Sequence, residues 1–328
     1  MIIGDDLYLK SLDGEDFRID SDLIQLFYRR TKLSEVQKEY TLVNQFLSKN
    51  DNIQCVELEI LKLLKDFGFA TERQMCDILG LKGIEMEVLD NVLSDCLRDK
   101  IINKFTLIQK GYQAMFNGMP EDGFCVYCLD YGAKYILNHY TNTDDLIWTS
   151  SDNVAIGHKV YKKLMVLEFY IQMCCSLGVE RIDKFYSYRD FTVRYDDKTT
   201  VFAMPASFTS INEKNGDGIS YLLDFVKGED IYNNWPKRLE HKLGPFFTRY
   251  WRLYYNALPM FFVIVEDENI AREVVSSFFR MTENDRIRAV LASDIFGDRD
   301  NFGLSSLRVY VYDELSSQKR QLMKENFI

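Results

Sequence analysis

The chain has 328 residues, of which 47% are hydrophobic, and a formal net charge of −10. Its length is compatible with two domains of roughly 150 residues each. The negative charge argues against a nucleic-acid-binding protein that relies on its global charge, but it leaves room for a local basic patch.

Cysteine usage and the N-terminal sequence bear on the cellular compartment. The seven cysteines have no regular spacing and their number is odd, which favours free thiols in a reducing compartment over a disulfide framework. The first residues, MIIGDD, lack the features of a signal peptide, and no stretch approaches the ~20 apolar residues of a membrane span. The sequence therefore predicts a cytoplasmic protein with no membrane partner.

Residues 1–50 are predicted to form an N-terminal helical extension. Two groups of apolar residues in it recur at helical spacing: Leu23, Ile24, Leu26 and Phe27, then Val43, Phe46 and Leu47.

Residues 51–145 are predicted to form a winged-helix domain. An apolar stripe indicates a first helix that ends near Gly68, and Thr71 is a good N-cap for a second helix. The remaining elements are a third helix over 84–98, strands over 101–108 and 124–129, and a closing helix over 131–140. This order is typical of a helix-turn-helix variant whose third helix commonly enters a DNA groove.

The polar, aperiodic segment 141–157 predicts a domain boundary, and residues 155–328 are predicted to form an α/β domain. Helices are expected over 158–177, 235–255 (broken at Gly244-Pro245) and 269–279, and strands over 184–195, 200–204, 219–226, 260–266, 286–292 and 307–312. The expected fold class is α/β (α+β), with a mixed sheet flanked by helices.

Three stretches resemble the replication-relaxation family of plasmids and integrative elements. They are Leu58–Leu79, then Leu89–Ile102 with Cys125–Leu137, and Met204-Pro205-Ala206 with Leu222–Gly228. The resemblance covers roughly residues 55 to 280. It implies a DNA-binding winged helix joined to a degenerate restriction-endonuclease-like core, acting in replication or transfer of a mobile genetic element.

A nuclease core of that kind requires an Asp after the Pro of one strand and an acidic-x-Lys pair on the next, which hold Mg²⁺ and activate water. Here Ala206 follows Pro205, and Val226 stands in the Lys position after Asp224, the degenerate catalytic candidate. Lys227 is one residue further on and should point to the opposite face of the strand. We therefore predict no catalytic residues and interpret Asp224 as an ordinary residue near the end of a strand.

Other motifs for chemistry are weak or missing in the sequence. Cys125-x-x-Cys128 is a lone pair that lacks the other two ligands of a structural zinc site, and we interpret it as buried apolar cysteine. No phosphate-binding Gly-rich loop and no G-x-S-x-G elbow occurs. We therefore predict no metal and no cofactor.

The predicted third helix, IEMEVLDNVLSDCLRD, is too acidic for simple groove binding. Two alternatives remain for DNA contact. The helix uses only its neutral and basic residues Asn91, Ser94 and Arg98, or DNA meets basic residues around the turn and wing: Arg73, Lys82, Lys100, Lys104 and Lys110. A second basic surface interleaved with aromatic residues holds four further DNA-binding candidates: Arg238, Lys242, Arg249 and Arg252. The alternative for that second surface is a core helix with a solvated basic face.

The leading hypothesis is a non-catalytic protein that binds double-stranded DNA in plasmid replication, transfer or their regulation. The alternative is a protein-protein interaction adaptor that uses the winged helix to contact a partner in a replication or transfer complex, or to form a homodimer. A metal-dependent nuclease is the weakest of the three hypotheses.

Overall fold

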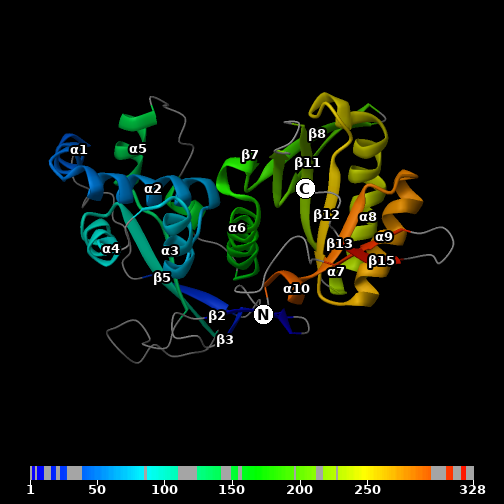
Figure 1. The fold of residues 1–328 in the computed structure, drawn as a ribbon, viewed down its shortest axis with the longest axis horizontal. Coiled ribbons are helices and arrows are strands. Elements are labelled where there is room, and N and C mark those ends of the chain that lie inside the picture. The colour runs from blue at the N-terminus through cyan, green and yellow to red at the C-terminus, as the bar shows by residue number, and fades with distance from the viewer. Residues whose placement is uncertain are drawn as a thin grey trace. The chain divides into compact units, whose positions relative to one another are not determined.

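The computed structural model is a mixed α/β protein that divides into two compact units (Figure 1). Leu9–Leu167 form one unit, here termed the helical unit, and Met1–Tyr8 with Glu168–Ile328 form the other, termed the sheet unit. The division falls inside α6 (Gly157–Leu177), beyond the polar segment at which the sequence predicted a boundary. The structure describes residues 2–3, 6–10, 16–19, 23–27, 39–84, 87–109, 124–141, 149–153, 157–195, 197–211, 217–226, 228–296, 308–312 and 319–322.

The helical unit contains several helices and a three-stranded antiparallel sheet. Its helices are α1 (Glu39–Leu47), α2 (Asp51–Phe67), α3 (Glu72–Leu81), α4 (Leu89–Arg98), α5 (Ala133–Thr141) and the 3-10 turn η2 (Ser150–Asn153). Its strands are β3 (Asp16–Ile19), β4 (Leu23–Phe27), β5 (Ile102–Gln109) and β6 (Phe124–Leu129). Strand β2 (Asp6–Lys10) spans the division between the units and pairs antiparallel with β1 (Ile2–Ile3) of the sheet unit.

The predicted N-terminal helical extension is wrong for residues 23–27. These residues form β4, which pairs antiparallel with β5, from Leu23 opposite Gln109 to Phe27 opposite Phe105. A short apolar run fits either a helix or a strand, so pairing with a distant segment decides its conformation. In the described part of the extension, helix is found in α1.

Local capping fixes the end of α2 at Gly68 and the start of α3 after Thr71, as the sequence predicts. Asn50 accepts a hydrogen bond from Ile53 N at 3.0 Å, and Gly68 ends α2 with a φ of 81°. Thr71 and Gln74 form a reciprocal capping box, with both hydrogen bonds at 3.2 Å. Each cap satisfies backbone groups that the helix itself leaves without a partner.

The segment between α2 and α3 joins the sheet of the helical unit. The order of that sheet is β4-β5-β6. Ala70 forms an antiparallel bridge with Tyr127 on β6, through N–H···O bonds of 3.1 Å and 2.8 Å. The bridge fixes the turn between the two helices against the hairpin, and Phe69 packs edge-on against Phe105 of β5 in the core.

The sheet unit is built on a seven-stranded mixed sheet of order β15-β14-β13-β12-β11-β10-β7. The central strands β11, β12 and β13 run parallel, and the outer pairs are antiparallel. Its strands are β7 (Ile182–Tyr186), β10 (Ala206–Ile211), β11 (Gly218–Val226), β12 (Met260–Val265), β13 (Ile287–Leu291), β14 (Arg308–Val311) and β15 (Lys319–Leu322).

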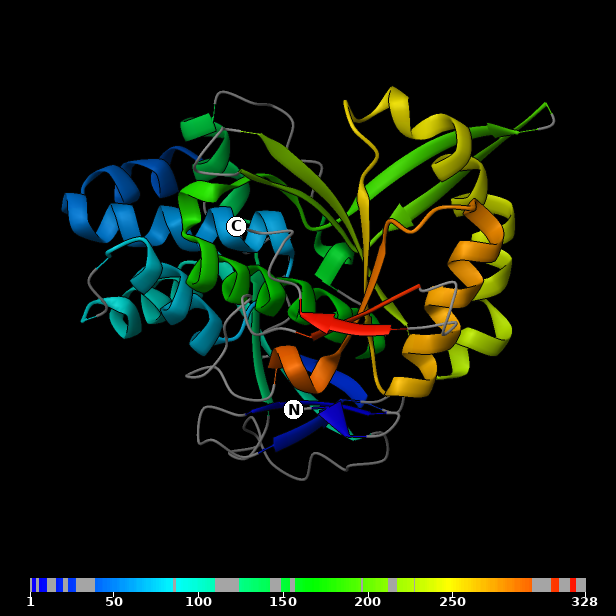
Figure 2. The ribbon, with the colours of Figure 1, turned by 45° about the vertical axis from the view of Figure 1, so that its right-hand side comes forward.

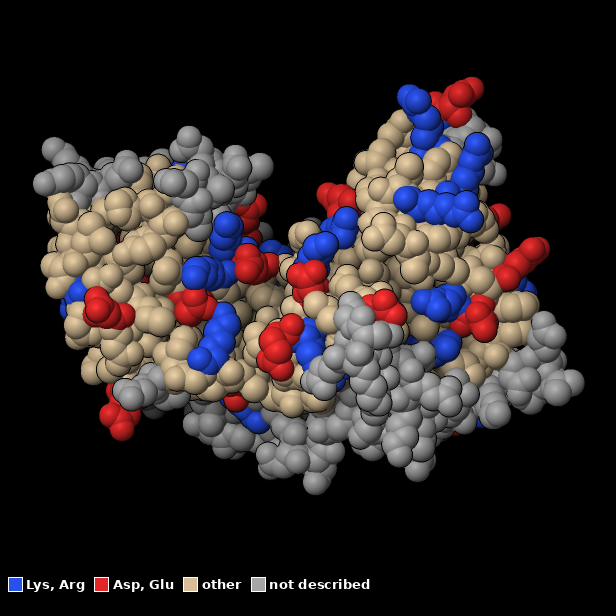
Figure 3. Space-filling model, turned by 45° about the horizontal axis from the view of Figure 1, so that its top comes forward, with Lys and Arg blue, Asp and Glu red and all other residues tan. Residues whose placement is uncertain are grey.

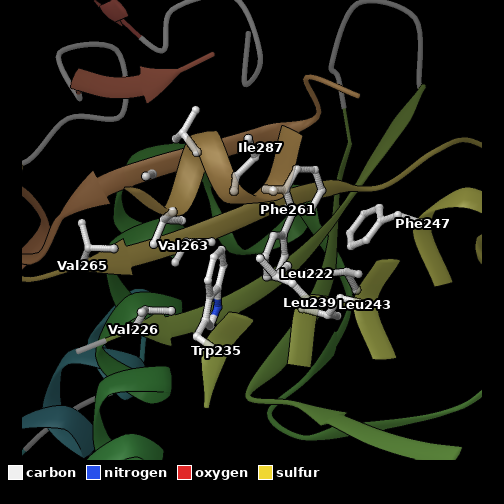
Figure 4. Packing of buried hydrophobic residues seen from close by; sticks show 14 of the residues in the cluster. Leu222, Val226, Trp235, Leu239, Leu243, Phe247, Phe261, Val263, Val265 and Ile287 are labelled. Atoms are coloured by element: carbon white, nitrogen blue, oxygen red, sulfur yellow. The ribbon is translucent and has the colours of Figure 1, made fainter. Parts of the chain in front are cut away.

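The parallel centre of this sheet is buried on both faces, as the continuous apolar sequence of β12 predicts. One face packs against Phe169 of α6 through Phe262. The other face carries the main core, in which Leu222, Phe261 and Val263 meet Trp235 and Leu239 (Figure 4). The helices of the unit beyond α6 are η3 (Val179–Arg181), α7 (Gly228–Asn233), α8 (Trp235–Arg238), α9 (Glu268–Thr282) and α10 (Ala292–Phe296).

The predicted helix break at Gly244-Pro245 is wrong. The chain stays helical from α8 through η4 (Leu239–Leu243), η5 (Phe246–Tyr250) and η6 (Trp251–Leu253), where η4 and η5 are π-helical. Pro245 has no N–H to donate, and the wider π turns on either side carry the helix through it. Gly244 is required because a Cβ there would lie 2.9 Å from the Leu239 carbonyl oxygen.

A two-stranded hairpin, β8 (Arg189–Tyr195) with β9 (Lys198–Met204), stands apart from the seven-stranded sheet. The sequence predicted one strand over 184–195, but the chain bends at Ser187-Tyr188 between β7 and β8. In Figure 2 this green hairpin projects beyond the sheet, and the yellow helical run lies alongside it.

Candidate nucleic-acid interface

Helix α4 presents a polar stripe to solvent. Leu89, Val92, Leu93 and Cys96 are buried on its inner side. Asn91, Ser94 and Arg98 are exposed on its outer side, at the helical spacing that puts them on one face. The structure therefore brings together the three α4 residues that the sequence assigned to DNA contact. Glu87 and Asp90 are exposed at the N-terminal end of the same stripe.

Arg98 is engaged by acidic neighbours. Its guanidinium contacts Asp95 at 2.7 Å and Asp99 at 3.3 Å. Exposed ion pairs of this kind contribute roughly 0–1 kcal/mol, so a phosphate group can displace them. The charge of Arg98 is thus available to a stronger anionic ligand.

The other candidates of the helical unit lie on elements other than the α4 stripe, and some are engaged by neighbours. Lys82 is paired with Glu59, which also binds Lys62 at 2.7 Å. Lys104 lies 5.6 Å above the ring of Tyr127, and Lys100 adopts a left-handed φ of 58°. Arg73 is half-buried on α3. Lys110 lies outside the described residues.

Glu57 is a buried carboxylate on α2, and it pairs with Lys49. Burial raises the pKa of Glu57, and the hydrogen bond from Lys49 opposes that shift. A raised pKa means that the folded protein binds the proton more tightly than the unfolded chain does. The carboxyl group then contributes stability that is present below its ordinary pKa of 4.5 and is lost as the pH rises through the folded value.

We therefore expect wild type to gain stability relative to Glu57→Gln on acidification. The difference in free energy of unfolding should favour wild type most below pH 4.5 and should shrink as the pH rises through the folded pKa. Urea unfolding at several pH values between about 4 and 7 measures it. A difference that stays constant, or that grows with pH, would contradict the assigned direction.

In the sheet unit, Arg238 is engaged by a buried carboxylate, and its role in DNA binding stays a prediction. Its guanidinium forms an ion pair with the buried Asp224. Burial lowers the pKa of Arg238 to about 10, and its Nε is buried without a hydrogen-bond partner in the described structure. Arg249 and Arg252 are exposed, beside the rings of Tyr250 and Trp251 at 5.7 Å and 5.3 Å. Lys242 is half-buried.

Asp224 is a buried, fully engaged carboxylate rather than an ordinary residue near the end of a strand. Asp224 lies on β11 and is 1% exposed. Oδ2 accepts a hydrogen bond from Trp235 Nε1 at 3.1 Å and pairs with Arg238, and Oδ1 accepts from Phe225 N at 3.0 Å. Buried charges of this kind are retained when they are paired and hydrogen-bonded, and both conditions hold here. Spacing along the chain does not predict this pair, because Asp224 lies on β11 and Arg238 on α8.

The register of the sheet explains why this site does not resemble a metal centre. Ala206 on β10 lies directly opposite Leu223, so its side chain points to the face of the sheet opposite to that of Asp224. Val226, on the same face as Asp224, is buried in the core. Within the described ranges no group of three or more His, Cys, Asp or Glu side chains is placed to hold a metal ion.

The Cys125-x-x-Cys128 pair is split between two environments. Cys128 is buried and its Sγ lies 3.8 Å from the Asn103 carbonyl oxygen, whereas Cys125 is half-buried beside Thr106. Burial raises the pKa of the Cys128 thiol well above its usual range, so the neutral thiol is the stable form.

A further basic group, which the sequence did not single out, lies on the β8–β9 hairpin. Arg194 and Lys198 are exposed near its tip, and Arg189 stands at its base. Alternation along β8, with Phe191 and Val193 buried between exposed residues, is the sequence signal that marks this strand as half-solvated.

No protein-family model matches the chain, and no curated protein and no solved structure proves similar to it. None of the helices in the described ranges combines the length and the apolar character that crossing a bilayer requires.

Proposed function

We propose that the helical unit is a winged helix that binds double-stranded DNA without catalysing a reaction. The observation that carries this proposal is the order α2, Ala70 bridge, α3, α4, β5, β6, in which the bridge to Tyr127 joins the helix pair to the hairpin. Helix-turn-helix variants of this order place their third helix in the major groove. Here that helix is α4, whose outer stripe of Asn91, Ser94 and Arg98 faces solvent.

The setting is part of the same proposal. The resemblance of residues 55 to 280 to the replication-relaxation family supports a role in plasmid or mobile-element replication, transfer or their regulation. A relaxase or replication-initiator gene beside the gene for this chain would support that role.

The sheet unit is proposed to be a non-catalytic, degenerate relative of the restriction-endonuclease core. Its support is the ion pair between Asp224 and Arg238, because a carboxylate that binds a guanidinium is already neutralised. Cleavage of plasmid DNA with Mg²⁺ that disappears in Asp224→Ala would contradict this part of the proposal.

The small number of cations near α4 determines how duplex binding should depend on salt. Three cations are candidates for phosphate contact in this region: Arg98 on α4, Lys100 just after it and Lys104 on β5. If each contacts one phosphate, the slope of log K against log salt is about −2.7, at −0.9 per contact. This is a shallow dependence, as expected of a protein with few phosphate contacts.

Duplex binding should therefore be measured by fluorescence anisotropy across a salt series from about 50 to 200 mM. Arg98→Ala should make the slope shallower by about 0.9. The matched control is Lys134→Ala, which removes an exposed cation from α5. Absence of binding at about 50 mM salt, or an equal effect of the control, would overturn duplex binding through α4.

A second candidate is a protein-contact role for the same helix, and the observation that favours it is the exposed pair Glu87 and Asp90. A Glu87→Gln/Asp90→Asn variant separates the two candidates. If α4 faces DNA, removing the repulsion of phosphate should raise duplex affinity, by roughly tenfold at low salt. If α4 forms a homodimer or binds a basic partner, duplex affinity stays unchanged and association, measured by sedimentation velocity, weakens.

A further inference from the structure

The β8–β9 hairpin and the segment Phe246–Tyr255, which includes the end of the helical run, form a surface of the sheet unit that is termed the hairpin platform. The inner face of the hairpin is apolar: Phe191 lies 5.0 Å from the Phe246 ring and 5.3 Å from the Phe202 ring. The hairpin therefore shares the main core of the unit, although it is not part of the seven-stranded sheet.

Polar contacts fix the hairpin on the helical run. The Tyr254 hydroxyl donates to the Thr192 carbonyl oxygen and accepts from Thr192 N, each at 3.1 Å. The Tyr250 hydroxyl donates to the Arg194 carbonyl oxygen. These contacts run along the backbone of β8 towards its tip, so they hold the backbone of Arg194 in place.

Arg189, at the base of the hairpin, contacts aromatic side chains of the hairpin and of its neighbouring segments. Its guanidinium lies near four aromatic rings: Tyr186 at 4.9 Å, Phe191 at 5.3 Å, Tyr255 at 5.4 Å and Tyr254 at 6.0 Å. These cation–π contacts stabilise the position of the guanidinium. The platform is thus organised before any ligand arrives.

The charge of the platform is positive among the described residues. Exposed cations on it are Arg194, Lys198, Arg249 and Arg252, and Arg189 is half-buried, whereas its acidic residues are Asp190 and Asp197. Figure 3 shows blue side chains gathered on the projecting end of the sheet unit at the upper right, with red ones beside them. Such a local patch attracts polyanions in a chain of net charge −10.

Exposed aromatic rings accompany these cations. Tyr186 is 45% and Tyr188 44% exposed at the bend that leads into β8. The rings of Tyr250 and Trp251 are half-buried beside Arg249 and Arg252. Unpaired bases stack on aromatic rings of this kind, while cations track the phosphates. A duplex keeps its bases stacked within the helix and does not offer them to such a surface.

We propose that the hairpin platform binds single-stranded DNA. Tyr186 and Tyr188 stack on unpaired bases, and Arg194, Lys198, Arg249 and Arg252 contact the backbone phosphates. The choice of DNA over RNA rests on the proposed function of the helical unit, whereas the fit to a single strand rests on the platform itself. The protein would then bind duplex and single-stranded DNA through different units.

The test is binding of a fluorescent oligo(dT) of about 20 nucleotides to the full-length chain, measured by anisotropy over a salt series. Arg194→Ala/Lys198→Ala should make the salt slope shallower by about 1.4, at 0.7 per phosphate contact on a single strand. Tyr188→Ala should weaken binding by about tenfold through lost stacking.

The matched control is Arg272→Ala/Arg280→Ala, which removes the same charge from exposed positions on α9. It should leave oligo(dT) binding unchanged. Equal weakening by the control, no binding of oligo(dT) at about 50 mM salt, or binding of oligo(U) as tight as that of oligo(dT) would overturn the proposal. Loss of duplex binding in Arg98→Ala, with oligo(dT) binding intact, would show that the two units act separately.

Discussion

Replacement of Asp224 by alanine is expected to lower the free energy of unfolding by about 3 kcal/mol, because it leaves a desolvated arginine without its counter-ion. Arg238 loses its ion pair and Trp235 Nε1 loses its acceptor in the same substitution. The lower end of the usual range applies because 27% of the Arg238 side chain reaches solvent. Urea denaturation followed by circular dichroism measures the change.

A double-mutant cycle separates the charge from the packing in this prediction. Asp224→Leu/Arg238→Met removes both charges and should recover part of the stability that Asp224→Ala loses, because a buried ion pair is about as stable as an apolar pair of similar volume. Recovery stays incomplete because Trp235 Nε1 still lacks its acceptor. Glu240→Ala, at an exposed position on the same helical run, is the control and should change stability by less than about 0.5 kcal/mol. If the effects of Asp224→Leu and Arg238→Met, each measured alone, add up to the effect of the double variant, Asp224 is not coupled to Arg238.

Replacement of Phe246 by alanine is expected to cost about 3–5 kcal/mol, the usual penalty for removing a buried aromatic side chain. Phe246 is fully buried and its ring lies 5.0 Å from Phe191 and 5.4 Å from both Phe202 and Phe247. The loss should therefore appear first in the hairpin, as faster amide hydrogen exchange in β8 and β9 than in β12.

Controls for Phe246 lie on the same helical run. Leu253 is 71% exposed, and Leu253→Ala should change stability by less than about 0.5 kcal/mol. Phe246→Leu keeps most of the apolar volume and should cost less than Phe246→Ala. If Phe246→Ala raised hydrogen exchange equally in β12 and in the hairpin, the hairpin would not depend on this residue in particular.

These two predictions depend on contacts between elements that lie far apart in the sequence. The fold likewise contains elements that local sequence predicts and elements that only distant contacts decide. Periodicity and capping residues sufficed to predict α2, α3, β5, β6 and β12, because each depends on its own side-chain pattern and its own ends. Thr71 is an example, since its capping box lies within four consecutive residues.

Local patterns give the wrong conformation where a distant partner decides it. Residues 23–27 have an apolar spacing that suits a helix, yet they form a strand because β5 offers an edge to pair with. Gly244-Pro245 reads locally as a break, yet π turns carry the helix through it. The local sequence predicts Arg238 to be a solvated cation of a basic helix, but its guanidinium forms an ion pair with the buried Asp224 of β11.

Local spacing along the chain is enough to specify a mixed α/β protein with a helix-helix-helix-hairpin order and a polar outer stripe on α4. Which basic residues stay in solvent depends instead on contacts between distant parts of the chain. Arg238 forms an ion pair with the buried Asp224, and Arg189 lies among four aromatic rings. Arg194 and Lys198 stay exposed on a hairpin whose backbone is hydrogen-bonded to Tyr250 and Tyr254. The physical reason is that the state of a charged side chain depends on the groups that surround it in space, which spacing along the chain does not record.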